Sequence, residues 1–217
     1  MDFAHQRRIM VDSQIRVNDV TDTSVVSAFM QTPREVFVPK SMQASSYAEY
    51  ELPTSEGRAL WIPRDLSKLL SALEPQANDI SLVIGAGAGY SAALLGRMTQ
   101  AVIALEEDEA LVEAMSERFA QIGLDQAVAT TGSLAQGLPG QGPYDLILIA
   151  GMVESIPDAW TAQLQEGGRL GVVVAKGKDL GEARIYKKAG ETVSYREAFE
   201  CCPPILPGFE NAPAFVF

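Results

Sequence analysis

The chain of 217 residues has the length of one α/β domain, and 47% of its residues are hydrophobic, enough to build a buried core. Its 28 acidic and 17 basic residues give a net charge of −11, which disfavours a nucleic-acid partner because such a partner needs a basic face. No apolar run approaches the roughly 20 residues that span a bilayer, and the first residues lack the apolar region of a signal peptide.

The cysteines and the histidine exclude further classes. Cys201 and Cys202 are adjacent, cannot build a disulfide framework, and favour a reducing compartment, with the cytoplasm as the expected location. The single histidine, His5, lies in a polar segment and is expected to be a solvated surface residue. One histidine and no spaced cysteines argue against a zinc site and against a Ser–His–Asp triad. We therefore expect no metal and no membrane partner.

Helical spacing of apolar residues dominates the first third of the chain. Helices are predicted at residues 3–16, 21–31 and 64–73. The second begins with the start signal Thr21–Ser24 and is closed by Pro33. Residues 32–63 are dense in proline and glycine and are predicted to form a long ordered loop, typical of a lid or binding loop.

The segment Ile80–Gly96 organises the rest of the chain. A short apolar run, predicted as a buried strand, meets the alternating glycines Gly85, Gly87 and Gly89 and then an Ala/Leu-rich helix. Glycine suits such a turn because it adopts positive φ without strain and lets backbone N–H groups approach a ligand. The next predicted strand, residues 101–105, ends in Glu106, where a carboxylate is placed to accept hydrogen bonds from a ribose diol. Together these elements predict a nucleoside-binding unit.

Strands and helices continue to alternate after this unit. The predicted elements are a helix at 109–121, a strand at 127–130, a loop at 135–143, a strand at 144–150, a helix at 156–164, a strand at 169–175, weakly alternating antiparallel strands at 182–188 and 192–199, and a proline-rich tail at 201–217 packed by its aromatic residues. Asp145 is expected to fix loop backbone. The alternation predicts an α/β fold, a doubly wound and mostly parallel sheet of Rossmann-like type with N-terminal helices and antiparallel C-terminal strands. We expect a single domain, with residues 1–75 as a helical and lid extension and 76–217 as the core.

The glycine turn alone leaves the cofactor open. Gly87, Gly89 and Ala92 fit the dinucleotide fingerprint G-x-G-x-x-A, whereas Gly85, Gly87 and Gly89 fit the G-x-G-x-G turn of methyltransferases that use S-adenosylmethionine. A third interpretation is that the turn only connects a strand to a helix. The acid at the next strand end favours a ligand over a plain connector.

A wider set of short motifs resembles the protein-L-isoaspartate O-methyltransferase family. They fall in the family's order and nearly at its spacing across about residues 10–190: Pro33-Arg34-Glu35-x-Phe37-Val38, Leu52-Pro53-x-x-x-Gly57, Pro63, Ile84-Gly85-x-Gly87-x-Gly89-Tyr90, Glu106, Tyr144-Asp145-x-Ile147, Ile156-Pro157 and Gln163-Leu164-x-Glu166-Gly167-Gly168-x-Leu170. A run of matches in order is far more specific than any one of them, and it favours S-adenosylmethionine as the cofactor.

The resemblance implies a protein or peptide substrate with an isoaspartyl-like carboxylate, and a role in protein repair through a succinimide formed from the product ester. A carboxylate with a pKa near 4 is already a nucleophile at neutral pH, so the protein need only align it with the methyl donor and exclude water. The residues that the resemblance places at the cofactor are Gly85, Ala86, Gly87, Gly89, Tyr90, Glu106, Glu107, Ser133 and Leu134.

Four positions depart from the family's pattern. Trp61 occupies the position of the family's active-site serine and Ala59 that of its threonine, while Val83 and Ser133 replace acids that would hold the cofactor. Trp61 is interpreted either as a stacking platform or plug in the substrate pocket, or as a filler of core space. Ser133 either bonds adenine weakly or caps a turn.

Three functions follow from these observations. The leading one is an S-adenosylmethionine-dependent O-methyltransferase that methylates a carboxylate on a protein or a small molecule. The second is a non-catalytic or re-purposed member that uses the pocket for binding, and it rests on the loss of polar site positions. The third, a nicotinamide-dependent oxidoreductase, rests only on the spacing of Gly87, Gly89 and Ala92.

Overall fold

The computed structural model describes residues 2–55, 57–177 and 180–210. The chain starts with helix α1 (Phe3–Met10), which continues as a π-helical turn (Val11–Ile15) and a 3-10 turn (Arg16–Asn18). The helix predicted at 3–16 is therefore present, with a changed hydrogen-bond pattern in its second half. Helix α2 (Thr23–Gln31) starts where its signal predicted, because the Asp22 carboxylate accepts the backbone N–H of Ser24 at 2.7 Å.

The segment predicted as a continuous loop contains regular structure. Two 3-10 turns (Arg34–Phe37 and Lys40–Ser45) follow the two prolines, and an antiparallel hairpin forms from β1 (Leu52–Ser55) and β2 (Arg58–Leu60) before helix α3 (Pro63–Leu73). The hairpin escapes sequence reasoning because its strands have four and three residues and one of them contains Pro53. It is the element that carries residues 58–61 to the site described below.

The main sheet has seven strands in the order β5-β4-β3-β6-β7-β8-β9. The strands are β3 (Ile80–Ile84), β4 (Ala101–Glu106), β5 (Ala127–Thr131), β6 (Tyr144–Val153), β7 (Leu164–Ala175), β8 (Gly181–Ala189) and β9 (Thr192–Cys201). The first five in this order pair in parallel and the last two in antiparallel fashion, which confirms the predicted fold class. Strand β7 begins earlier than predicted, through the irregular stretch at Gly167, where φ is +77°.

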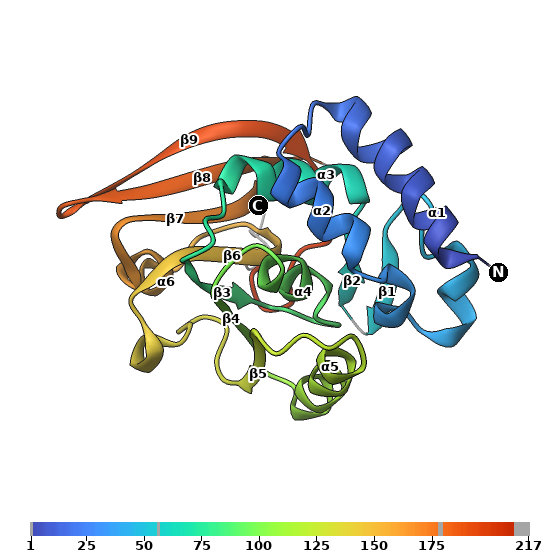
Figure 1. Cartoon of the computed structure of the whole chain (residues 1–217). Coiled ribbons are helices and arrows are strands. Elements are labelled where there is room, and N and C mark those ends of the chain that lie inside the picture. Colours follow the sequence, from blue (N-terminus) through green and yellow to red (C-terminus); the bar gives the residue numbers. More distant parts are fainter. Residues whose placement is uncertain (1, 56, 178–179, 211–217) are drawn as a thin grey trace, which may run out of the picture.

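Helices and loops cover both faces of the sheet (Figure 1). One face packs against α1, α2, α3, α4 (Tyr90–Gly96) and α5 (Glu109–Gln121) through a cluster that includes Val83, Leu146 and Phe119. The other face packs against the short helix α6 (Asp158–Ala162) and the C-terminal segment through Ile84, Ile149 and Trp160. Alternate side chains of β3 enter opposite clusters, as expected for a strand buried on both sides.

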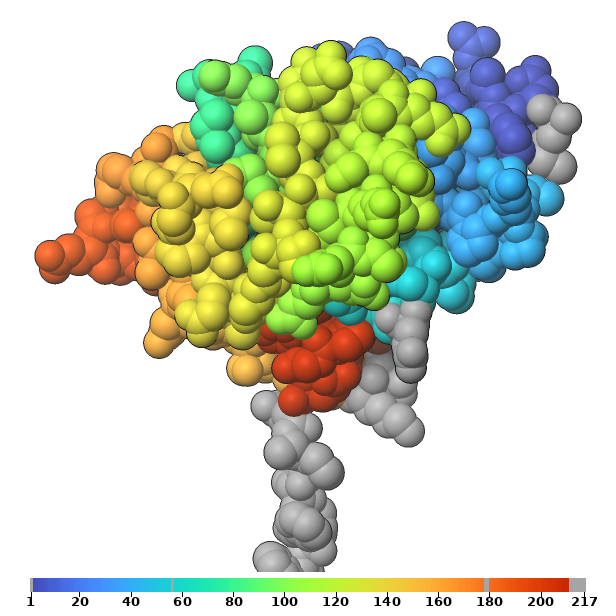
Figure 2. All heavy atoms as spheres, turned by 90° about the horizontal axis from the view of Figure 1, so that it is seen from below, coloured from blue at the N-terminus to red at the C-terminus, as the bar shows by residue number. Residues whose placement is uncertain are grey.

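The C-terminal segment, residues 203–210, runs along the end of β6. Leu206 donates its N–H to the Met152 carbonyl at 2.8 Å, and the Met152 N–H reaches the Pro204 carbonyl at 2.9 Å. The rings of Phe209 and Trp160 pack in a tilted arrangement with centroids 5.1 Å apart, which agrees with the aromatic packing predicted for the tail. Residues 211–217 of that prediction lie outside the described residues. Figure 2 shows this segment in red near the cyan residues of the β1–β2 hairpin.

Three smaller expectations concern surface and backbone. His5 is exposed, and Asp145 accepts the backbone N–H of Ile80 at 2.8 Å, so it fixes the start of β3 as predicted. Cys201 is buried and Cys202 exposed, and neither forms a disulfide within the part of the chain that the structure describes. Within the described part of the chain, no helix has the length and apolar character needed to cross a bilayer.

Candidate functional site

The glycine turn and Glu106 meet at one edge of the sheet. Strands β3 and β4 are parallel with Ile84 beside Leu105, so the turn that follows β3 lies next to the acid that ends β4. The backbone N–H groups of Gly85 and Ala86 both reach the Leu105 carbonyl, at 3.0 and 3.1 Å. The N–H of Gly87 then donates to Glu106 Oε2 at 2.9 Å. The sequence prediction that turn and acid form one unit is consistent with this geometry.

Glu106 is fully buried, and four N–H donors surround its carboxylate. Besides Gly87, the backbone N–H of Glu107 donates to Oε1 at 3.0 Å. The other two donors belong to Arg58 of strand β2, whose Nε lies 2.9 Å from Oε2 and whose Nη2 lies 2.7 Å from Oε1. This two-pronged pairing is the strong form of an Arg–carboxylate contact.

The donors around Glu106 outweigh the effect of burial on its pKa. Burial alone raises the pKa of a carboxyl group, but the hydrogen bond and charge of Arg58, together with the N–H groups of Glu107 and Gly87, lower the pKa of Glu106 below its usual value. Because the folded-state pKa is depressed, the ionised carboxylate stabilises the fold above the unfolded-state pKa. That stabilisation is lost as the pH falls through the folded-state value.

Replacing Glu106 by glutamine is therefore expected to destabilise the protein most at neutral pH. The variant leaves the Arg58 guanidinium, only 11% exposed, without its counter-charge, which costs about 2–3 kcal/mol of unfolding free energy. The difference in unfolding free energy between the variant and the unmodified protein should shrink as the pH falls below about 4.5. Urea unfolding between pH 3 and 7 measures it, with Glu113→Gln on the exposed side of α5 as the matched control. A gap that does not change with pH would contradict the role given to Glu106.

A buried arginine holds the loop that leads from the hairpin to α3. Arg34 is fully buried; its Nη2 donates to the Trp61 carbonyl and its Nε to the Ser46 carbonyl, both at 2.7 Å. Its guanidinium lies over the ring of Tyr90 at 5.0 Å from the centroid. Burial lowers the pKa of Arg34. Arg34 therefore fixes the backbone at residue 61 relative to helix α4.

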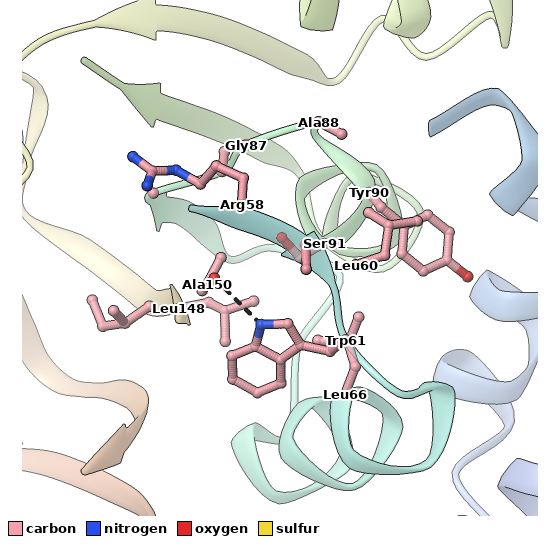
Figure 3. A pocket seen from close by; sticks show the side chains of 14 residues that line it. Arg58, Leu60, Trp61, Leu66, Gly87, Ala88, Tyr90, Ser91, Leu148 and Ala150 are labelled. Atoms are coloured by element: carbon pink, nitrogen blue, oxygen red, sulfur yellow. Dashed lines mark hydrogen bonds between the residues drawn. The ribbon is translucent and has the colours of Figure 1, made fainter. Parts of the chain in front are cut away.

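Trp61 lines the pocket beside the glycine turn (Figure 3). Its side chain comes from the loop before α3, its indole Nε1 donates to the Ala150 carbonyl at 3.3 Å, and it is 5% exposed. It shares the pocket with Arg58, Leu66 and Leu148. The indole therefore forms a pocket wall that is also part of the core, which agrees with the core-filling interpretation. Its role in a substrate pocket stays a prediction.

The other predicted site residues lie at different depths. The ring of Tyr90 is fully buried between Phe29 and Phe37 rather than beside Glu106, at centroid distances of 6.2 and 5.4 Å. Val83 is fully buried in the core cluster that packs against helices α1 to α5. On the far side of Glu106, Glu107 Oε1 accepts the backbone N–H of Leu134 at 3.0 Å, and Ser133 beside it is exposed.

Sequence reasoning missed Arg58 and the role of Arg34. Arg34 belongs to a motif quoted above, but nothing in the motif shows that it would bond the carbonyl of residue 61. Arg58 lies in a proline- and glycine-rich stretch, 48 positions before its partner Glu106. A basic residue beside the glycine of a predicted binding loop was the one available signal.

Fold and site together define a class: a Rossmann-like nucleoside-binding domain of the methyltransferase type. A family model described as protein-L-isoaspartate(D-aspartate) O-methyltransferase matches residues 5–202. The chain belongs to the protein-L-isoaspartate(D-aspartate) O-methyltransferase family, as the resemblance of its motifs predicted.

Known relatives agree with this assignment. A protein-L-isoaspartate O-methyltransferase of Roseiflexus castenholzii is 34% identical over 193 residues, covering 89% of this chain and 88% of its own. One from Methylorubrum extorquens is 36% identical over 173 residues, covering 80% and 75%.

The fold is shared with solved structures. A protein-L-isoaspartate O-methyltransferase superposes with a TM-score of 0.81 at 23% identity, covering 93% of this chain and 66% of its own. A Plasmodium falciparum protein assigned to the same enzyme class, solved with S-adenosyl-L-homocysteine, has a TM-score of 0.76 at 16% identity and covers 92% and 97%.

Proposed function

We propose that this protein transfers a methyl group from S-adenosylmethionine to a carboxylate of a protein or peptide. The observation that carries the proposal is the buried Glu106 carboxylate bound by the N–H of Gly87, which joins the glycine turn and the acid in one site. Family membership decides between the cofactors that the glycine turn left open, because the family is named for methyl transfer and needs no nicotinamide.

The chemical types of the residues in the site fit an adenosine-bearing methyl donor. Glu106 is placed to accept hydrogen bonds from a pair of ribose hydroxyls, and the backbone at Gly85 and Gly87 has positive φ (+72° and +55°), which glycine adopts without strain. We propose that the adenine lies near Glu107, Ser133 and Leu134, at the carboxyl ends of β4 and β5, and that Ala86, Gly89 and Tyr90 shape the turn. When bound, the sulfonium supplies an activated methyl group.

The chain's own residues then orient the acceptor and keep water out. Leu66 and Leu148 present an apolar wall, and an apolar wall leaves a carboxylate poorly solvated and therefore more nucleophilic. No general base is required, since a carboxylate is ionised at neutral pH. The indole stands where the family has a serine, so we propose that the acceptor is held by its peptide backbone and by shape.

The acceptor is proposed to be an isoaspartyl carboxylate, which would make the protein a repair enzyme. The two cysteines without a disulfide fit a reducing compartment such as the cytoplasm. Family membership favours this enzyme over a non-catalytic relative.

Methyl-labelled S-adenosylmethionine tests the proposal directly. The protein is incubated with an isoaspartyl peptide, with the same peptide carrying normal aspartate, and with no peptide. Base-labile label on the isoaspartyl peptide alone is expected. Equal labelling of both peptides would keep a carboxyl methyltransferase but contradict the isoaspartyl acceptor. No labelling, together with no calorimetric binding of the cofactor, would contradict the proposed function.

A further inference from the structure

The carboxylate expected to bind a ribose is already saturated by this chain. Glu106 Oε2 accepts from Arg58 Nε and Gly87 N, and Oε1 accepts from Arg58 Nη2 and Glu107 N. A carboxylate offers about four acceptor sites, and all four are used. A ribose diol would have to donate to the same two oxygens. The backbone N–H groups belong to the turn itself, so Arg58 is the partner that a ligand must replace.

The stem of Arg58 also covers the glycine turn. A Cβ placed on Gly87 would lie 3.5 Å from Cβ, Cγ and Cδ of Arg58, which is van der Waals contact. The cavity left among Arg58, Trp61 and the turn has a volume of ≈ 20 Å³, about the room of one water. Figure 3 shows the arginine side chain reaching across the turn at Gly87. A nucleoside therefore cannot enter while Arg58 holds Glu106.

Leu206, another side chain near the turn, is a fixed wall. It is 1% exposed, its backbone is bonded to Met152, and it packs where a Cβ on Gly85 or Gly151 would stand, at 2.6 and 2.8 Å. Arg58, in contrast, extends from the three-residue strand β2 of a hairpin outside the main sheet. Its guanidinium is bonded through Nε and Nη2 to Glu106.

We propose that Arg58 is the residue that sets cofactor affinity and specificity: it competes with the ribose diol for Glu106, so the site accepts a ligand only when two ribose hydroxyls replace the two guanidinium donors. This inference rests on the proposed function. Its quantitative consequence is that the apparent dissociation constant equals the intrinsic one divided by the fraction of molecules in which Arg58 has left Glu106. Removing Arg58 therefore tightens binding although it removes a buried ion pair.

Titration calorimetry with S-adenosyl-L-homocysteine, combined with thermal unfolding, tests the inference without turnover. Arg58→Ala is expected to bind at least tenfold more tightly than the unmodified protein while its ligand-free melting temperature falls. Arg58→Gln keeps much of the stem over Gly87 and is the substitute if the alanine variant does not fold. It too should bind more tightly while its ligand-free melting temperature falls. Arg58→Lys keeps the charge but loses the two-pronged geometry of the guanidinium. Its affinity and its melting temperature should lie between those of Arg58→Ala and the unmodified protein. Arg64→Ala is the control, because Arg64 is 40% exposed and pairs with Asp65 on α3 away from the pocket.

The outcomes separate the inference from the function. If Arg58 had only a structural role, its removal would lower both stability and affinity. That result, or equal affinities for all variants, would overturn the inference and leave the cofactor assignment intact. Absence of binding by every variant and by the unmodified protein would overturn the proposed function, and the inference with it.

Discussion

Replacing Gly87 by valine is expected to weaken the binding of S-adenosyl-L-homocysteine by a factor of about 100 or more, or about 3 kcal/mol. Gly87 has φ of +55°, a conformation that a β-branched residue adopts only with strain, and its N–H is a donor to Glu106. The added side chain would also project into the space over the turn. Calorimetry measures the affinity, and thermal unfolding shows whether the variant is folded.

Gly123 provides the matched control for this substitution. Its φ of +60° is nearly the same, and nothing lies within 4 Å of an added Cβ. Gly123→Val should therefore lose stability through backbone strain and keep its affinity. If Gly87→Val kept its affinity as well, the glycine turn would be only a connector between β3 and α4.

The double substitution Trp61→Ser with Ala59→Thr is expected to raise isoaspartyl methylation at least tenfold. These changes introduce the polar side chains that the resemblance predicts at both positions, and they remove the indole from the pocket wall. The loss of a buried Trp side chain should also cost about 3–5 kcal/mol of unfolding free energy. Activity and stability are thus expected to change in opposite directions, which labelled methyl transfer and urea unfolding measure on the same samples.

Two single variants separate the contributions. Trp61→Phe keeps an aromatic wall but loses the bond from Nε1 to the Ala150 carbonyl, so its activity should stay at the original level. Ala59→Thr adds a hydroxyl on strand β2 without opening the pocket and should give little gain alone. A folded double variant with unchanged methylation would show that the indole does not limit the isoaspartyl reaction.

The sequence predicted what depends on local patterns. The strand Ile80–Ile84, the glycine turn, helix α5 and the acid at the end of β4 were found within one or two residues because apolar runs, glycines and caps are encoded side by side. The antiparallel strands β8 and β9 were also predicted, from weak alternation. Each of these elements is specified by its own residues.

The sequence could not predict what depends on distant partners. The short hairpin β1–β2 carries too few residues for a periodic signal, yet it brings Arg58 to Glu106 and Trp61 to Ala150 across 48 and 89 positions. The π-helical turn after α1 was not predicted either. The candidate site was therefore half predictable: Glu106 and the glycine turn were expected, but the pairing of Arg58 with the Glu106 carboxylate was not.

The wall formed by Leu206 has a consequence for how the protein is made. The crevice takes residue 58 from the early hairpin, residue 61 from the loop after it, residues 85–87 from the middle and residue 206 from a later segment. During synthesis on the ribosome, the β1–β2 hairpin and the glycine turn are complete before residues 203–210 emerge and join the end of β6. The Leu206 wall is therefore the last of these parts to form, and a chain that stops before residue 203 would lack it.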